Sequence, residues 1–212
     1  MARRDVTIEA VVFDFGGVII TPITDKMDAL AVRHNTTVGQ LVQVLLGPHQ
    51  SGDHPWHRAE RGELAVADIQ GQLGPWAMQA GLHLHGDEID VLLAPGYRVI
   101  DEMVAMIATV YGMGIRTALL TNTFAEFRPT LEATVDFRLF DQVIESYAVS
   151  ARKPEPAIYH ATAAALGVDH ERIAYLDDFE QNLAPAVMLG WTVVRVTDPL
   201  EAIATLAQLL AM

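Results

Sequence analysis

The chain has 212 residues, of which 51% are hydrophobic, so it is long enough to bury a core as one domain or as a core with a smaller insert. Its formal charge of −13 argues against a nucleic-acid partner, and no run rich in lysine or arginine offsets that charge locally. The sequence contains no cysteine, which excludes disulfides and thiolate chemistry and is typical of a reducing compartment.

The N-terminal sequence MARRDVTIEA is followed by only three apolar residues, VVF, before Asp14. This stretch is too short for a signal peptide or a membrane span. We therefore expect a cytoplasmic protein with no membrane partner.

Short apolar segments alternate with helix-capable sequence through much of the chain. Five of these segments have the length and composition of buried strands: 8–13, 115–121, 142–145, 173–176 and 192–196. Three segments are expected to form helices: 97–111, 155–166 and 199–210. The alternation predicts an α/β fold, a Rossmann-like three-layer α/β/α core with a parallel sheet.

The segment 22–95 has a different pattern, with long helical stretches, scattered glycines and prolines, and most of the histidines. We interpret it as a helical cap inserted after the first strand, which leaves 1–21 and 96–212 as the core. An insert at this point would lie above the carboxyl ends of the strands, where open α/β sheets bind ligands.

Polar residues follow the first two expected strands. Asp14 precedes the Gly16-Gly17 pair, which would let a ligand approach the backbone closely, so its carboxylate could act as a nucleophile or a metal ligand. Thr121 and Asn122 end the second strand and offer donors suited to phosphate oxygens. Taken alone, an Asp before a glycine turn is more often an ordinary turn residue or helix cap, and Thr121 is equally a helix cap.

Two further polar segments occur later in the chain. Lys153 precedes Pro154 at the start of an expected helix and could neutralise both a phosphate and a carboxylate nucleophile. Asp177 and Asp178 end the fourth strand, where adjacent carboxylates would raise each other's pKa unless a cation such as Mg²⁺ compensated them. Because the carboxyl ends of parallel strands share one edge of the sheet, all four segments should converge there.

The segments VVFDFGGV, ALLTNT, ARKPEPAIY and AYLDDFEQN resemble, in order, the four motifs of the haloacid dehalogenase superfamily. The resemblance extends from Ile8 to Val196. It looks closest to the branch that contains the N-terminal phosphatase domain of soluble epoxide hydrolases and bacterial anomeric-sugar phosphatases. Within the insert, only the sequence ERGEL at 60–64 looks similar to those relatives.

This resemblance implies a Mg²⁺-dependent hydrolase that cleaves a phosphate monoester of a small phosphorylated metabolite. Asp14 would attack phosphorus to form an aspartyl-phosphate, with Lys153 as the second catalytic residue. Thr121, the N–H of Asn122 and Lys153 would hold the phosphoryl oxygens. Water would then hydrolyse the intermediate.

The resemblance also implies the metal ligands. Mg²⁺ would be held by Asp14, the backbone carbonyl of Gly16 and Asp178, with Asp177 binding directly or through water. The chain departs from the family at Gly16, where phosphatases commonly carry a second Asp that protonates the leaving oxygen. Activated leaving groups should suffer least from its absence, and His57 or Glu60 of the insert is a hypothetical substitute.

Two other functions stay open. A 2-haloacid dehalogenase also uses a strand-end Asp and lacks the second Asp, which favours this alternative. Against it, a metal-free dehalogenase gains nothing from the paired carboxylates of Asp177 and Asp178. A non-catalytic binding or regulatory protein could keep the same fold without the missing acid.

The remaining candidate residues lie in the insert. The pairs His54/His57 and His83/His85 lack a ligand spacing that recruits acidic or further histidine residues, so we expect them to pack in the cap or to be exposed. Trp56 is the tryptophan expected at a cap pocket. Neither the leaving group nor the choice between a monomer and a homodimer follows from the sequence.

Overall fold

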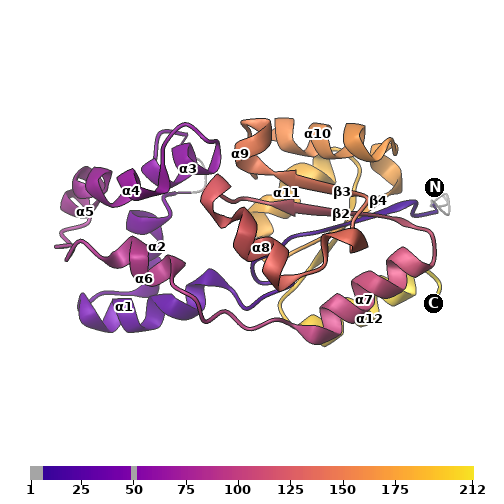
Figure 1. Ribbon diagram of the computed structural model, residues 1–212, viewed down its shortest axis with the longest axis horizontal. Helices are drawn as coiled ribbons and strands as arrows, with labels where there is room; N and C mark the ends of the chain where they lie inside the picture. The colour runs from indigo at the N-terminus through magenta and orange to yellow at the C-terminus, as the bar shows by residue number, and fades with distance from the viewer. Residues whose placement is uncertain (1–6, 49–51) are drawn as a thin grey trace.

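The computed structural model describes residues 7–48 and 52–212 (Figure 1). Its centre is a sheet of five parallel strands in the order β3-β2-β1-β4-β5. The strands are β1 (Ala10–Phe13), β2 (Arg116–Thr121), β3 (Gln142–Glu145), β4 (Ile173–Asp177) and β5 (Thr192–Arg195). All five expected strands form, although β1 begins at Ala10 rather than at residue 8.

Helices cover both faces of the sheet. The helices α7 (Asp101–Gly112) and α12 (Pro199–Leu209) pack on one face, and α10 (Pro156–Leu166) and α11 (Glu180–Met188) pack on the other (Figure 1). Successive side chains of a strand point to opposite faces, so alternate residues of β1 enter two separate hydrophobic clusters. The prediction of a Rossmann-like three-layer α/β/α core is therefore confirmed.

Sequence signals at the helix ends explain where these helices begin and end. The side chain of Asp198 accepts hydrogen bonds from the N–H groups of Leu200 and Glu201 and so caps α12. Helix α10 ends at Gly167, whose φ of 64° is the left-handed conformation that glycine adopts without steric cost. Two short helices, α8 (Arg128–Thr134) and α9 (Ser146–Val149), follow β2 and β3.

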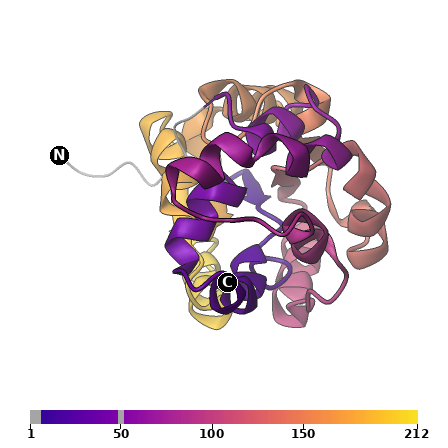
Figure 2. The same cartoon turned by 90° about the vertical axis from the view of Figure 1, so that its left-hand side faces the viewer.

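The insert predicted over 22–95 consists of short helices. They are η1 (Ile23–Lys26), α1 (Met27–Arg33), α2 (Val38–Leu45), α3 (Pro55–Glu60), α4 (Val66–Gln72), α5 (Gly74–Gln79) and α6 (Glu88–Leu93). They bury a hydrophobic cluster of their own, to which the core contributes Phe124. Figure 1 shows these helices at one end of the sheet, and Figure 2 looks onto them.

The chain enters and leaves the insert through two segments that lie side by side. The N–H of Thr21 donates to the carbonyl of Arg98, and the N–H of Ile100 donates to the carbonyl of Ile19. This pairing holds the insert above the carboxyl ends of the strands. Residues 1–6, which belong to the predicted core, lie outside the described residues. Among the described residues, no helix is both long and apolar enough to span a membrane.

Candidate active site

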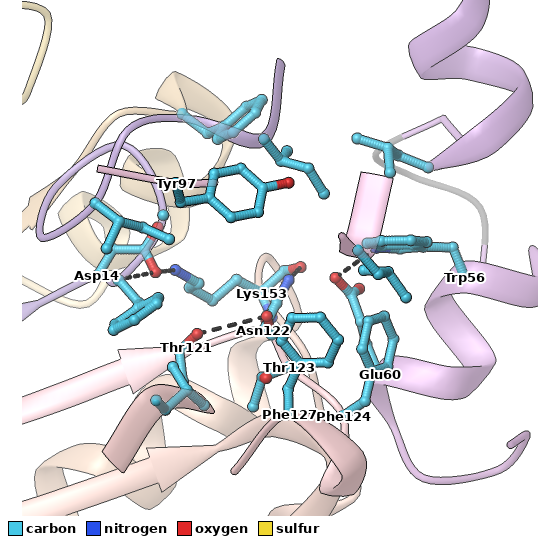
Figure 3. A pocket seen from close by; sticks show the side chains of 18 of the residues that line it. Asp14, Trp56, Glu60, Tyr97, Thr121, Asn122, Thr123, Phe124, Phe127 and Lys153 are labelled. Atoms are coloured by element: carbon cyan, nitrogen blue, oxygen red, sulfur yellow. Dashed lines mark hydrogen bonds and ion pairs between the residues drawn. The ribbon is translucent and has the colours of Figure 1, made fainter. Parts of the chain in front are cut away.

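The carboxyl ends of β1, β2 and β4 meet beneath the cap at a cavity of about 390 Å³ (Figure 3). Six of the seven predicted site residues line this cavity: Asp14, Gly16, Thr121, Asn122, Lys153 and Asp178. The seventh, Asp177, is fully buried directly beside Lys153. Residues from four separate segments of the sequence are thus brought to one place by the parallel sheet.

Lys153 is the cation at the centre of the site, and its side chain is only 1% exposed. Its Nζ lies 2.7 Å from Asp14 Oδ1 and 2.8 Å from Asp177 Oδ2. Burial acts to lower the pKa of Lys153, but the charges of Asp14 and Asp177 outweigh it and hold that pKa above the ordinary value. Lys153 therefore stays protonated in a site shielded from water.

The side chain of Asn122 fixes the backbone around Lys153. Its Oδ1 accepts the N–H of Lys153 at 2.8 Å, and its Nδ2 donates to the carbonyl of Lys153 at 3.0 Å. These two hydrogen bonds join the end of β2 to the loop before α10. Thr121 and Asn122 both line the cavity, and the Thr121 hydroxyl makes only a long contact of 3.4 Å, with the carbonyl of Asn122.

Asp14 has the environment of a carboxylate that needs a cation. Burial raises its pKa well above the ordinary value, Asp177 and Asp178 raise it further, and Lys153 opposes them. Its Oδ1 also accepts the N–H of Phe15 at 2.7 Å. A nucleophilic carboxylate must be ionised, so this site favours a second positive charge beside Asp14.

Asp178 supplies an unused ligand atom for such a charge. Its Oδ1 is buried and has no hydrogen-bond partner, which holds for few side-chain atoms of the described residues. Burial, together with the charge of Asp177, raises the pKa of Asp178 to about 7. One carboxylate oxygen each of Asp14, Asp177 and Asp178 lies within 4.8 Å of the others, and this donor set fits a divalent cation that prefers carboxylate oxygens.

The position of Asp178 also explains Gly17. Gly17 has a φ of 76°, and a Cβ built there would lie 2.2 Å from Asp178 Oδ2. Any other residue would displace that carboxylate. Gly16 differs, because a Cβ there would meet none of the described atoms within 4 Å, so packing does not exclude the carboxyl that the family commonly has at this position.

Asp177 is held by several donors that the sequence analysis did not assign to the site. Tyr175 Oη donates to Oδ2, Asn182 Nδ2 lies 3.1 Å from each oxygen, and the N–H of Phe179 donates to Oδ1 at 2.8 Å. Tyr175 lies two residues before Asp177, on the same side of β4, and that spacing was the available signal. These contacts direct Asp177 toward Lys153.

The cap contributes Trp56, His57 and Glu60 to the cavity wall. Figure 3 shows Trp56 and Glu60. Both oxygens of Glu60 are engaged, one by Trp56 Nε1 at 2.8 Å and the other by Arg152 Nε. Both oxygens of Glu60 thus already accept hydrogen bonds from within the protein. The ion pair joins the cap to Arg152, the residue that precedes Lys153.

The rest of the cavity wall is largely apolar. Side chains of the cap and of the core form it together: Phe15, Ile20, Ile23, Val42, Leu46, Leu93, Tyr97, Val99, Phe124, Phe127 and Leu131. Tyr97, Phe124 and Phe127 of this set face the same space as Lys153 (Figure 3). The cavity thus has an ionic end at the strand termini and an apolar remainder.

Comparison with known proteins identifies the family. The model of the haloacid dehalogenase-like hydrolases matches residues 8–190. The chain belongs to this hydrolase family. The resemblance of its four motifs is thereby confirmed, and the protein is a hydrolase of the haloacid dehalogenase type.

Two curated relatives of this hydrolase match nearly its whole length. Acyl-CoA dehydrogenase family member 10 of Mus musculus is 26% identical over 95% of the chain, which spans only 19% of that relative. A sesquiterpene phosphatase of Aspergillus oryzae is 26% identical over 96% of the chain and 97% of the relative. The second relative is thus a protein of about the same length.

Two solved structures of the family share the fold. A haloacid dehalogenase family enzyme of Bacteroides thetaiotaomicron, solved with magnesium and inorganic phosphate, has a TM-score of 0.62 at 18% identity and covers 89% of this chain and 93% of its own. The L-2-haloacid dehalogenase of Xanthobacter autotrophicus has a TM-score of 0.63 at 22% identity. The match covers 95% of this chain and 83% of that one. At such identities the likeness concerns the fold alone.

The raised pKa of Asp178 predicts how the stability of this hydrolase depends on pH. Because the folded pKa of about 7 exceeds the ordinary 3.8, the folded state binds a proton that the unfolded state has lost, and stability falls as the pH rises through this window. Thermal unfolding in EDTA should therefore occur at lower temperature at pH 7 than at pH 5. Added Mg²⁺ should restore the unfolding temperature at pH 7. Asp178→Asn should weaken the dependence of the unfolding temperature on pH. An unchanged dependence in that variant would contradict its assignment to Asp178.

Proposed function

We propose that this hydrolase cleaves phosphate monoesters whose leaving group is apolar, with Asp14 as the nucleophile and Mg²⁺ as the cofactor. The observation that carries the proposal is the two-part cavity. Its ionic end combines Asp14, Lys153 and Asp178, and the remaining wall is largely apolar. The first part suits a phosphate and the second suits a hydrocarbon group.

Asp14 begins the reaction by attacking phosphorus in line with the ester oxygen. The new bond joins its carboxylate oxygen to phosphorus, while the bond from phosphorus to the ester oxygen breaks. That oxygen leaves with the electron pair and takes a proton from a water molecule, since Gly16 supplies no acid. The ammonium of Lys153, the hydroxyl of Thr121 and the N–H of Asn122 hold the phosphoryl oxygens. The hydroxide that this proton transfer leaves then attacks the phosphorus of the aspartyl-phosphate, which releases inorganic phosphate and regenerates the carboxylate of Asp14.

Asp14, Asp178 and the carbonyl of Gly16 would hold Mg²⁺, with Asp177 binding directly or through water. The bound ion supplies positive charge that offsets the repulsion between the carboxylates and an anionic substrate. The unpartnered Oδ1 of Asp178 and the raised pKa of Asp14 support this cofactor. A metal-free dehalogenase would leave that buried oxygen of Asp178 uncompensated.

The apolar wall supports a hydrocarbon leaving group over a sugar. A sugar has several hydroxyl groups, and each would lose its hydrogen bonds to water on entering an apolar cavity. A hydrocarbon chain would instead gain free energy from leaving water. The likeness over nearly the whole chain to a sesquiterpene phosphatase supports the same substrate class.

A series of straight-chain alkyl phosphates tests this proposal. KM should fall about two- to fourfold per added CH₂ until the cavity is filled, since burial of one CH₂ contributes about 0.8 kcal/mol. Glucose 6-phosphate should be a poor substrate. Equal KM values along the series, or a preference for the sugar phosphate, would contradict the proposed leaving group.

A matched pair of variants locates the effect in the cavity wall. Val42→Asn places an amide in the wall and should weaken the dependence of KM on chain length. Val32→Asn makes the same change on an exposed part of the cap, where the side chain is 84% exposed, and should leave KM unchanged. Equal effects of the two variants would argue against binding at this wall.

A further inference from the structure

We propose that the cap of this hydrolase contains a second metal site, in which His34, His85 and Glu88 bind a Zn²⁺-class ion. His34 directly follows α1, His85 lies before α6, and Glu88 is the first residue of α6. One possible ligand atom of each residue lies within 4.8 Å of the others. None of these three residues is among the described residues that line the Asp14 cavity.

The imidazole of His34 provides the strongest argument. Its Nδ1 lies 3.0 Å from the carbonyl of His83, and since a carbonyl only accepts, Nδ1 must carry the proton. In the neutral ring Nε2 then has a free lone pair, as a metal ligand requires. That nitrogen is buried without a hydrogen-bond partner, and its side chain is only 2% exposed.

The atom that His34 Nε2 faces is a carboxylate oxygen. Glu88 Oε1 lies 3.1 Å away, within the range of an ion pair with a protonated ring, although the two atoms do not form a hydrogen bond. In the neutral ring a lone pair faces that carboxylate oxygen, which is repulsive in a buried place. A cation placed between the two atoms converts that repulsion into two coordinate bonds.

Several donors hold the carboxylate of Glu88 in place. Its side chain is fully buried, and the N–H groups of His85 and Gly86 donate to its two oxygens at 2.6 and 3.1 Å. The side-chain amide of Gln70 also donates to Oε2 at 2.8 Å. Such donors commonly orient the carboxylates that bind metals.

Arg33 is the competing cation, since its Nη2 lies 3.2 Å from Glu88 Oε1. The guanidinium also makes two shorter contacts with the exposed Asp87, at 2.7 and 2.9 Å. Arg33 therefore keeps a carboxylate partner when a metal ion takes the oxygen of Glu88. The contact lowers the affinity of the site without blocking it.

The third ligand leaves the site open on one side. His85 is exposed, and the centre of its ring lies 4.7 Å from that of His34. Two imidazoles and one carboxylate suit Zn²⁺ and similar transition-metal ions, with water as a fourth ligand, rather than Mg²⁺. The local spacing of His83 and His85 alone did not indicate this, because folding is needed to bring His34 to them.

Binding would join the end of α1 to the start of α6. These helices lie in the cap, away from the sheet (Figure 1). Leu93 at the end of α6 is part of the cavity wall, so a metal ion at this place would stabilise one side of that wall. The proposed role is therefore structural, and it is independent of the chemistry at Asp14.

Zinc titration of the tag-free protein tests the site. Isothermal titration with Zn²⁺ alone should show one more bound ion in the wild type than in His85→Ala, and Zn²⁺ should raise the unfolding temperature of the wild type only. His85 is exposed, so the variant is expected to fold. Co²⁺ should give the intense visible absorption of a four-coordinate site in the wild type and lose it in His85→Ala.

Two control variants separate this site from others. His83→Ala removes a neighbouring imidazole but keeps the carbonyl that orients His34, so it should retain the zinc response. Asp178→Asn impairs the carboxylate site at the strand ends and should also retain it. Equal zinc binding and equal stabilisation in the wild type and His85→Ala would overturn the proposal, as would loss of the response in Asp178→Asn.

Discussion

Asp14→Asn is expected to reduce turnover of a phosphate monoester by about four orders of magnitude or more, because removal of a covalent nucleophile is among the largest single losses in enzymes. The amide matches the carboxylate in size but cannot form the bond to phosphorus. It also removes a buried charge whose ionisation burial disfavours, so the fold should remain intact. Initial rates of phosphate release and circular dichroism of the same samples check both expectations.

Asp28→Asn is the matched control for that variant. Asp28 is an exposed carboxylate on α1 of the cap, and its replacement changes the net charge by the same amount. We expect its turnover to equal that of the wild type. Comparable rates in Asp14→Asn and the wild type would remove Asp14 from the mechanism and favour the non-catalytic alternative.

Lys153→Met should cause the largest loss of stability of any single change in the site. It leaves the carboxylates of Asp14 and Asp177 buried without the cation that lies within 2.8 Å of each. Breaking a buried ion pair by removing one partner typically costs about 3–5 kcal/mol. Urea unfolding in EDTA should show this loss, because a divalent cation would otherwise compensate the carboxylates.

A second change should restore part of that stability. Lys153→Met combined with Asp177→Asn removes one of the two uncompensated charges, so its free energy of unfolding should exceed that of the single Lys153 variant. Turnover should stay abolished in both, since neither can hold the phosphoryl group. If Lys153→Met unfolds at the same urea concentration as the wild type, the lysine is not the cation that balances these carboxylates.

The fold was largely predictable because the signals that define it are local. The segment 142–145 forms β3 with the expected bounds, and the apolar runs at 116–121 and 173–177 form β2 and β4 within one residue of the prediction. Buried parallel strands are apolar on both faces, which makes them recognisable without knowledge of their neighbours. Their order in the sheet depends on pairing between distant segments, so it was not predicted.

The site was predictable only where its residues lie in motifs. Asp14, Lys153 and Asp178 follow strands or precede a helix, and the topology of a parallel sheet brings such residues together. The buried pair of Glu60 and Arg152 joins residues 92 positions apart. That contact depends on how the cap packs on the core, for which no local pattern exists.

The cap also explains why the sequence alone does not indicate the proposed substrate class. Its helices contribute Val42, Leu46 and Trp56 to the cavity wall, and the core contributes Phe124 and Phe127. In the sequence these residues are indistinguishable from ordinary core positions. Their packing around a space beside Lys153 supports the proposed apolar leaving group.

One assay tests the central claim most directly: phosphate release from an alkyl phosphate, with Mg²⁺ or with EDTA, measured beside halide release from 2-chloropropionate. The account predicts phosphate release that requires Mg²⁺ and is lost in Asp14→Asn, and it predicts no halide release. Halide release that persists in EDTA, without phosphate release, would contradict it and make the protein a dehalogenase.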